Sequence, residues 1–165
     1  MTEPTVVRPR AILETWTDSH DQVNYKFTLP GPCRTKKAHN DAARTGRKCP
    51  VCHLGTGRVR VFPSPQFRKW QELVARYVAT KPELHLFLSR PVNVRSLVFR
   101  DREIGDFDGY MNAIGDVLQH VGILLNDKYV AHRDGSRLLK DADDPRVEIV
   151  VTVLGPPEPV QEALL

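Results

Sequence analysis

The sequence predicts an α+β fold, a two-layer sandwich in which two main helices pack on one mixed but mostly antiparallel sheet. Alternating apolar and polar residues predict a strand at 23–29, and the run 147–153 is the clearest strand in the sequence. Apolar residues at helical spacing predict helices over 64–80 and 107–121. A short polar turn joins the strand at 23–29 to an earlier one at 11–16, so these two form a hairpin. This order of elements favours an antiparallel-rich sheet covered by helices.

One domain accounts for nearly all of the chain. Its 165 residues suit a single domain, which we place at 1–155, and the proline-rich stretch 156–165 is expected to form a flexible tail. No apolar run approaches the roughly 20 residues of a membrane span. The N-terminus lacks the cationic start and apolar core of a signal peptide. We therefore expect a cytoplasmic protein with no membrane partner.

The first half of the chain has clear boundary signals. The strand at 23–29 places every second side chain on a buried face and ends at Pro30-Gly31-Pro32. A short strand is expected at 57–62. Ser64 followed by Pro65 is a favourable helix start, because serine is a good N-cap and proline suits the first helical position.

The second half continues with strands and a second helix. Two strands are expected at 83–88 and 94–99. The helix begins at an N-cap aspartate, either Asp106 or Asp108, and ends at Gly122. Its apolar stripe consists of Phe107, Tyr110, Met111, Ile114, Val117, Leu118 and Val121.

Charge is distributed unevenly along the chain. Residues 1–80 carry 14 Lys and Arg against 6 Asp and Glu, whereas residues 81–165 carry 10 against 14, so a half of net charge +8 precedes a half of −4. A basic half beside an acidic one suggests a polyanionic partner next to a cation site. A solvated basic face with no partner explains this charge equally well.

Three aspartates form the pattern most informative about function. Asp106 and Asp108 are two residues apart at the expected helix start, and Asp127 follows that helix after Gly122. Carboxylates gathered in one place repel one another, and an oxygen-only set with room for water and phosphate suits Mg²⁺. A helix N-terminus also favours anionic phosphate. The alternative is that the first two acids only cap the helix and the third only begins a turn.

These acids belong to a longer resemblance. Its residues are Gly105-Asp106-Phe107-Asp108, Ala113, Asp116-Val117-Leu118, Gly122 and Asp127. They resemble the RusA family of Holliday junction resolvases, which shows Asp-x-Asp-Asn, a lysine three residues later, a helical Asp-x-Leu segment, a glycine and an Asp-Asp pair. The similarity covers about residues 23–154 apart from a cysteine-bearing stretch, and includes the pair Lys36-Lys37.

The resemblance implies a Mg²⁺-dependent, homodimeric endonuclease that resolves four-way DNA junctions by paired nicks in opposing strands. Asp106, Asp108 and Asp127 match the family's metal-binding catalytic aspartates. It also implies a RusA-like domain in a bacterial or phage-infected cell, because such proteins are frequently phage-encoded.

Three positions depart from the family pattern. Gly109 replaces an asparagine, Asn112 replaces the lysine and Asn126 replaces the first aspartate of the pair. The lysine matters most, because a cation there can orient water or neutralise the reacting phosphate. Nearby candidates to supply that charge are Arg100, Arg102 and Lys128. The alternatives are slower catalysis, or a protein that binds junctions without cutting them.

The segment 33–56 has little hydrophobic periodicity and is expected to be a long inserted loop. Cys49 and Cys52 form a C-x-x-C pair within it, and Cys33 lies sixteen positions before that pair. Three thiolates and one imidazole would make a tetrahedral Zn²⁺ site, for which His39 is preferred over His53 as fourth ligand. Such ligation would replace the missing apolar core. Reduced structural thiols are the alternative.

Lys and Arg residues are frequent in and just after this loop, and two more arginines precede Asp106 and Asp108. The predicted DNA-binding residues are Lys36, Lys37, Arg44, Arg47, Lys48, Arg58, Arg60, Arg100 and Arg102. Residues of this kind grip phosphates without reading bases. We expect the loop to contact the arms of branched DNA.

The last five residues, which begin with Gln161 and end with Leu165, loosely resemble the Gln-x-x-Leu-(Phe/Leu) peptide that docks on bacterial sliding clamps. A plain flexible tail is the alternative.

Two rival functions stay open beside the nuclease. One is a junction- or single-strand-binding protein without catalysis, which Asn112 favours. The other is a zinc-bearing interaction module that recruits replication proteins through this tail.

Overall fold

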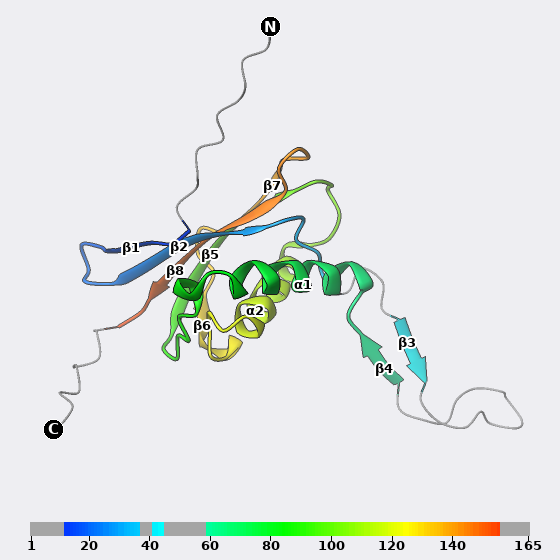
Figure 1. Ribbon diagram of the computed structural model, residues 1–165, viewed down its shortest axis with the longest axis horizontal. Coiled ribbons are helices and arrows are strands. Elements are labelled where there is room, and N and C mark those ends of the chain that lie inside the picture. The colour runs from blue at the N-terminus through cyan, green and yellow to red at the C-terminus, as the bar shows by residue number, and fades with distance from the viewer. Residues whose placement is uncertain (1–11, 37–40, 45–58, 156–165) are drawn as a thin grey trace, which may run out of the picture.

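The computed structural model describes residues 12–36, 41–44 and 59–155. For 41–44 and 59–62 it describes the backbone alone. In this part of the chain a six-stranded sheet has two helices packed on one side (Figure 1). The sheet strands are β1 (Glu14–Thr17), β2 (Val23–Pro30), β5 (Val92–Arg100), β6 (Val130–His132), β7 (Arg137–Lys140) and β8 (Arg146–Val153). The predicted fold class, a two-layer α+β sandwich, is confirmed.

The centre of the sheet is β8, and the strand order is β1-β2-β8-β5-β6, with β7 also paired to β5. Ile149 of β8 lies between Phe27 of β2 and Ser96 of β5, and all pairings from β1 to β5 are antiparallel. The two short strands β6 and β7 instead run parallel to β5. A strand flanked on both sides is buried on both edges, which agrees with the continuous β-branched run of β8.

Helix α1 (Pro65–Ala79) starts where the sequence predicts. The Oγ atom of Ser64 accepts a hydrogen bond from the backbone N–H of Phe67 at 3.1 Å, and proline occupies the first helical position. The indole of Trp70 is buried and its Nε1 donates to the carbonyl of Pro30 at 3.2 Å. This bond fixes the helix against the end of β2.

Helix α2 (Phe107–His120) also follows its local signals. Asp106 is the N-cap, and its Oδ1 accepts from the backbone N–H of Gly109 at 2.7 Å. The helix ends at Gly122, which has a φ of +75°. A Cβ atom there would lie 2.9 Å from Cε1 of Phe87, so only glycine fits this turn. The carbonyl of Leu118 accepts the backbone N–H groups of the two residues after the glycine, at 3.0 and 3.1 Å.

The strand predicted at 83–88 is wrong. The segment begins with a 3₁₀ helix, η1 (Pro82–Leu84), and Phe87 has a left-handed φ of +46°. Only Leu88 forms a β-bridge, and its partner is Leu124 on the stretch that follows α2. The proline lacks a backbone N–H and fixes φ, which favours a turn over a paired strand. The bridge nevertheless guides the chain after α2 back along the helix.

The insert predicted as a loop at 33–56 contains a strand. β3 (Asp41–Arg44) pairs antiparallel with β4 (Val59–Phe62), and we call this hairpin the β3–β4 arm. Figure 1 shows the arm extending beyond the N-terminal end of α1. Its base is closed by two hydrogen bonds, from Ser64 N to the carbonyl of Lys36 at 3.2 Å and from Ser64 Oγ to that of Thr35 at 3.3 Å. β3 itself has little strand propensity, so its pairing with β4 defines it.

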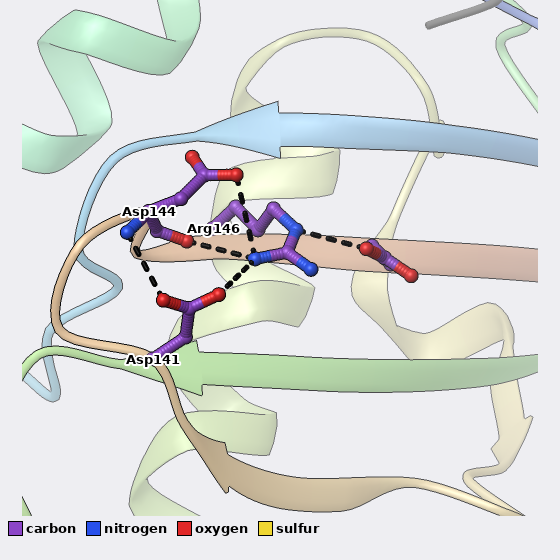
Figure 2. A network of polar contacts seen from close by, with 4 residues as sticks. Asp141, Asp144 and Arg146 are labelled. Carbon is purple, nitrogen blue, oxygen red and sulfur yellow. Dashed lines mark hydrogen bonds and ion pairs between the residues drawn. The ribbon is translucent and has the colours of Figure 1, made fainter. Parts of the chain in front are cut away.

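An arginine at the turn between β7 and β8 holds three acids (Figure 2). Arg146 Nη1 lies 2.8 Å from Asp141 Oδ2 and 3.5 Å from Asp144 Oδ2, and Nε lies 2.8 Å from Glu148 Oε1. The guanidinium also stacks on Phe99, 3.7 Å from the ring centroid. This network holds the β7–β8 connection against β5.

Within the described residues, neither helix has the length and apolar character of a membrane crossing.

A second ion pair links the chain entering the arm with the chain entering α2. Arg34 donates to both carboxylate oxygens of Asp101, at 2.7 and 2.6 Å. Hydrogen bonding from this guanidinium lowers the pKa of Asp101 to about 2. Because 22% of the Asp101 side chain is exposed, solvent screens part of the interaction.

This ion pair predicts a loss of stability in acid. The pKa of Asp101 is lower in the folded state than the ordinary value of about 3.9, so the pair stabilises the protein above that value. We expect about 1 kcal/mol to be lost as the pH falls from about 4 to about 2. Urea unfolding at pH 5 and pH 2.5 measures it, and Asp101→Asn should lose less than the wild-type protein. Asp143→Asn, an exposed carboxylate on the β7–β8 turn, is the control, and equal losses in both variants would contradict the assignment.

Candidate functional site

One side of α2 carries an exposed line of polar residues. Asp108, Asn112, Gly115 and Gln119 recur at spacings of four, three and four, so they lie along one face of the helix. We call them the α2 stripe. Asp108, Asn112 and Gln119 are exposed, whereas Gly115 is covered by the segment that packs beside it. The stripe is thus an accessible surface on a rigid element.

Asp106 is the N-cap of this helix, and Asp108 lies in its first turn. Asp106 is exposed and uses one carboxylate oxygen for the cap. Asp108 is exposed, and it makes no ion pair with any residue that the structure describes. The unpaired N–H groups of a first turn make this region favourable for anions, including phosphate. Two acids here therefore adjoin a place where a phosphate and a cation can be bound together.

An Asp106→Asn variant distinguishes the helix-capping role of Asp106 from a role in binding a metal ion. Asparagine caps a helix about as well as aspartate, so Asp106→Asn should change the free energy of unfolding by less than about 0.5 kcal/mol. If Asp106 holds a metal ion, the same change also removes a charged ligand. In that case we expect any Mg²⁺-dependent activity to fall sharply while the urea midpoint stays constant. Unchanged activity would leave Asp106 with the cap alone.

Asp127 returns to the same helix from the chain that follows it. It is the first residue of a 3₁₀ helix, η2 (Asp127–Tyr129), and its backbone N–H donates to Oε1 of Gln119 at 3.0 Å. Its Cβ atom lies 3.9 Å from the place where a Cβ on Gly115 would stand. Asp127 therefore lies in van der Waals range of the stripe at Gly115. The turn at Gly122 makes this return possible.

Asp108 and Asp127 lie along one helix face, whereas Asp106 precedes it as the N-cap, and the three aspartates do not form one tight group. Asp108 is seven positions from Gly115, beside which Asp127 lies, and this separation corresponds to roughly 10 Å of helical rise. Among the residues that the structure describes, no group of three or more His, Cys, Asp and Glu side chains is arranged to hold a metal ion. Mg²⁺ usually takes one or two carboxylates together with water and substrate phosphate. Asp106 at the N-cap and Asp108 in the first turn are both exposed and supply donors of this kind.

A cation lies between the two ends of this acidic face. Nη1 of Arg133 donates to Oδ1 of Asn112 at 3.1 Å, and its Nη2 lies 3.9 Å from the Cβ position of Gly115. Arg133 follows β6 and is separated from Asn112 by twenty-one positions in the sequence. Sequence reasoning missed this residue, because no local pattern distinguishes it from other arginines in extended segments.

The three cations predicted to supply the charge that Asn112 lacks make other contacts. Arg100 lies 5.8 Å from the ring centroid of Tyr110. Nε of Arg102 lies 3.5 Å from Oδ2 of Asp101. Lys128 lies 5.2 Å from the ring centroid of its neighbour Tyr129. None of these contacts is with Asn112, so among the cations that the structure describes Arg133 is the one that contacts this residue.

The base of the β3–β4 arm lies against another side of α2. Lys36 forms an ion pair with Asp116 and lies 5.7 Å from the ring centroid of Phe67. An open groove of about 310 Å³ lies here, and its lining includes Gln119 of the stripe. Of the other predicted DNA-binding residues, Arg44 and Arg60 lie on β3 and β4. Those outside the described residues are Lys37, Arg47, Lys48 and Arg58.

The proposed zinc ligands are mostly outside the described part of the chain. His39, Cys49, Cys52 and the alternative His53 all lie there, as do the last five residues. Cys33 is described, and it is only 2% exposed within the core. Burial raises the pKa of the Cys33 thiol well above its usual value, so the neutral thiol is the stable form in this environment. This favours a reduced structural thiol at Cys33, and the zinc site stays a prediction.

No protein-family model matches this chain, and no curated protein sequence matches it at a significant level. The likeness to the RusA family accordingly depends on the quoted residues and their order. It stays a prediction, as does every activity that it implies.

Proposed function

We propose that this chain is a Mg²⁺-dependent, structure-specific endonuclease that resolves four-way DNA junctions by paired nicks. The observation that carries the proposal is the return of Asp127 to the helix whose first turn holds Asp106 and Asp108. The sequence order alone allowed these acids to be unrelated. Asp108 and Asp127 lie along one exposed helix face with Arg133 between them and Asp106 at the N-cap, and this arrangement supports a site for a metal and a phosphate.

Each residue has a role in this proposal. Asp106 and Asp108 would hold the ion, and the first-turn N–H groups of α2 would bind a phosphate oxygen. Bound Mg²⁺ supplies an activated water and neutralises charge on the phosphate. Asp127 extends the negative face along the helix, where its backbone is held by Gln119. Because these side chains are on rigid elements, little reorganisation is needed when DNA binds.

The rest of the surface suits branched DNA. The strands of the β3–β4 arm carry Arg44 and Arg60, and Lys36 at its base is fixed to α2 by Asp116. A basic arm that leaves from the side of the acidic helix can follow one DNA arm while the helix contacts a phosphate. Paired nicks require two such sites. A homodimer with two-fold symmetry would place one site on each of two strands.

A junction-cleavage assay tests this function. A synthetic four-way junction and a linear duplex of matched sequence are incubated with the protein in Mg²⁺ or in EDTA. We expect nicked duplexes from the junction in Mg²⁺ alone. A folded protein that binds the junction and yields no nicked duplex at any Mg²⁺ concentration would contradict the enzymatic proposal.

A non-catalytic junction-binding protein is the second candidate. It is favoured by the neutral Asn112 and by the placement of Asp127 two turns away from the first-turn acids. In that case the junction would bind equally well in Mg²⁺ and in EDTA, and all of its strands would stay intact. The same assay therefore decides between the two functions.

A further inference from the structure

Arg133 is held in a defined position by the turn that follows β6. The backbone N–H of Ser136 donates to the carbonyl of Arg133 at 3.2 Å. Oγ of Ser136 donates to the carbonyl of Val94 at 3.2 Å and accepts from the backbone N–H of Ser96 at 3.0 Å. The next residue, Asp134, donates its backbone N–H to Oδ1 of Asn93 at 2.9 Å. The turn is thereby fixed to β5, and the arginine side chain leaves from a rigid base.

Unlike Arg34 and Arg146, Arg133 is not paired with a carboxylate among the described residues. Arg34 and Arg146, both largely buried, are paired with carboxylates. Arg133 is half-buried, and its contact is the neutral carboxamide of Asn112. It forms no ion pair with a carboxylate in the described ranges of the chain. The unpaired positive charge of Arg133 is therefore presented at the α2 stripe, between Asp108 and Asp127.

The geometry leaves donors of Arg133 for a ligand. A guanidinium has five N–H groups in a planar fork, and the bond to Asn112 uses one of them. A carboxamide oxygen can only accept, so Asn112 orients the guanidinium without neutralising it. The remaining N–H groups suit two oxygens of one phosphate, which is the pairing that arginine makes better than lysine.

We propose that Arg133 binds a backbone phosphodiester of DNA at the α2 stripe, and that Asn112 is the positioning residue that holds its guanidinium. The choice of a DNA phosphate rests on the proposed function. Arg133 lies between the first-turn acids and Asp127, so a phosphate bound to it would lie along the acidic face. The arginine thus brings to the site the charge that Asn112 lacks.

Three variants test this inference. Arg133→Met removes the charge and keeps the apolar stem, Arg133→Lys keeps the charge and loses the fork, and Arg137→Met removes an exposed arginine on the neighbouring strand β7. Junction affinity is measured by fluorescence anisotropy in EDTA at several salt concentrations. Nicking is measured separately under single-turnover conditions in Mg²⁺.

We expect Arg133→Met to lower the magnitude of the slope of log K against log salt by about 1 more than Arg137→Met does. We also expect it to slow nicking about 100-fold at saturating protein. Arg133→Lys should restore the salt slope and only part of the rate. Circular dichroism and melting confirm that each variant is folded, and if Arg133→Met is not, Arg133→Gln replaces it in both measurements.

The outcomes separate this inference from the proposed function. If the wild-type protein does not nick, the proposed function fails, and the salt slope alone decides whether Arg133 binds phosphate. If the wild-type protein nicks and Arg133→Met matches Arg137→Met in slope and rate, the inference about Arg133 is overturned while the nuclease stands. A slope effect without a rate effect would still support phosphate binding by Arg133 and would place that phosphate away from the scissile one.

Discussion

Asp108→Asn is expected to lower the Mg²⁺-dependent nicking rate about 1,000-fold while the protein continues to bind four-way junctions. Asparagine has nearly the same shape as aspartate, but it carries no charge and is a poor ligand for a hard cation. Asp108 is exposed and does not form the N-cap, so the change should leave the fold intact. Removing a negative charge beside the DNA should keep the affinity equal or increase it.

Single-turnover cleavage of an end-labelled junction measures the rate, and anisotropy measures the binding. Asp143→Asn is the matched control, because Asp143 is also exposed and lies on the β7–β8 turn and not on α2. We expect its rate to equal that of the wild-type protein. If Asp108→Asn and Asp143→Asn nick at the same rate, Asp108 has no part in catalysis.

Leu118→Ala is expected to lower the free energy of unfolding by about 3 kcal/mol. Leu118 is completely buried, and its backbone carbonyl accepts the two N–H groups that follow the end of α2. Shortening its side chain leaves a cavity between α2 and the sheet at the point where the chain turns toward Asp127. We therefore expect the largest stability loss among single changes near the site, together with a weaker hold on the chain leading to Asp127.

Urea unfolding followed by circular dichroism measures this loss. Leu125→Ala is the control, since 56% of Leu125 is exposed and its truncation should cost less than about 0.5 kcal/mol. A cost below about 1 kcal/mol for Leu118→Ala would show that the interior around α2 is loosely packed. Such looseness would weaken the argument that the stripe is a rigid surface.

The helices of this protein could be predicted because their boundary signals are local. Ser64 before a proline and Asp106 before an apolar stripe each cap a helix through a side chain three residues from its partner. Gly122 is needed because the chain turns there with a positive φ. Signals of this kind depend on neighbours in sequence, so they survive without knowledge of the tertiary fold.

The errors concern pairings between distant segments. The residues around Phe87 have strand-like composition, but the tertiary fold sets them beside the chain after α2 through a single bridge. β3 exists because β4 pairs with it across an insert, and β6 and β7 both run parallel to β5. Composition does not encode a partner that lies far away in the sequence.

In the candidate site, too, the features with local sequence signals could be predicted and those that depend on distant segments could not. That Asp127 returns to α2 could be expected from the glycine that ends the helix, and the structure brings it there. That Arg133 would contact Asn112 could not be expected, because the contact depends on the parallel placement of β6 beside β5. The burial of Cys33 likewise follows from packing and not from its spacing to the other cysteines.

The central claim is that the acids of α2 serve Mg²⁺-dependent cleavage of branched DNA. Strand-by-strand mapping tests it most directly: each of the four strands of a junction is end-labelled in turn, and the products in Mg²⁺ are resolved on a denaturing gel. The account predicts one nick in each of two opposing strands, at equivalent positions. Four intact strands in a junction that the folded protein has bound would contradict it.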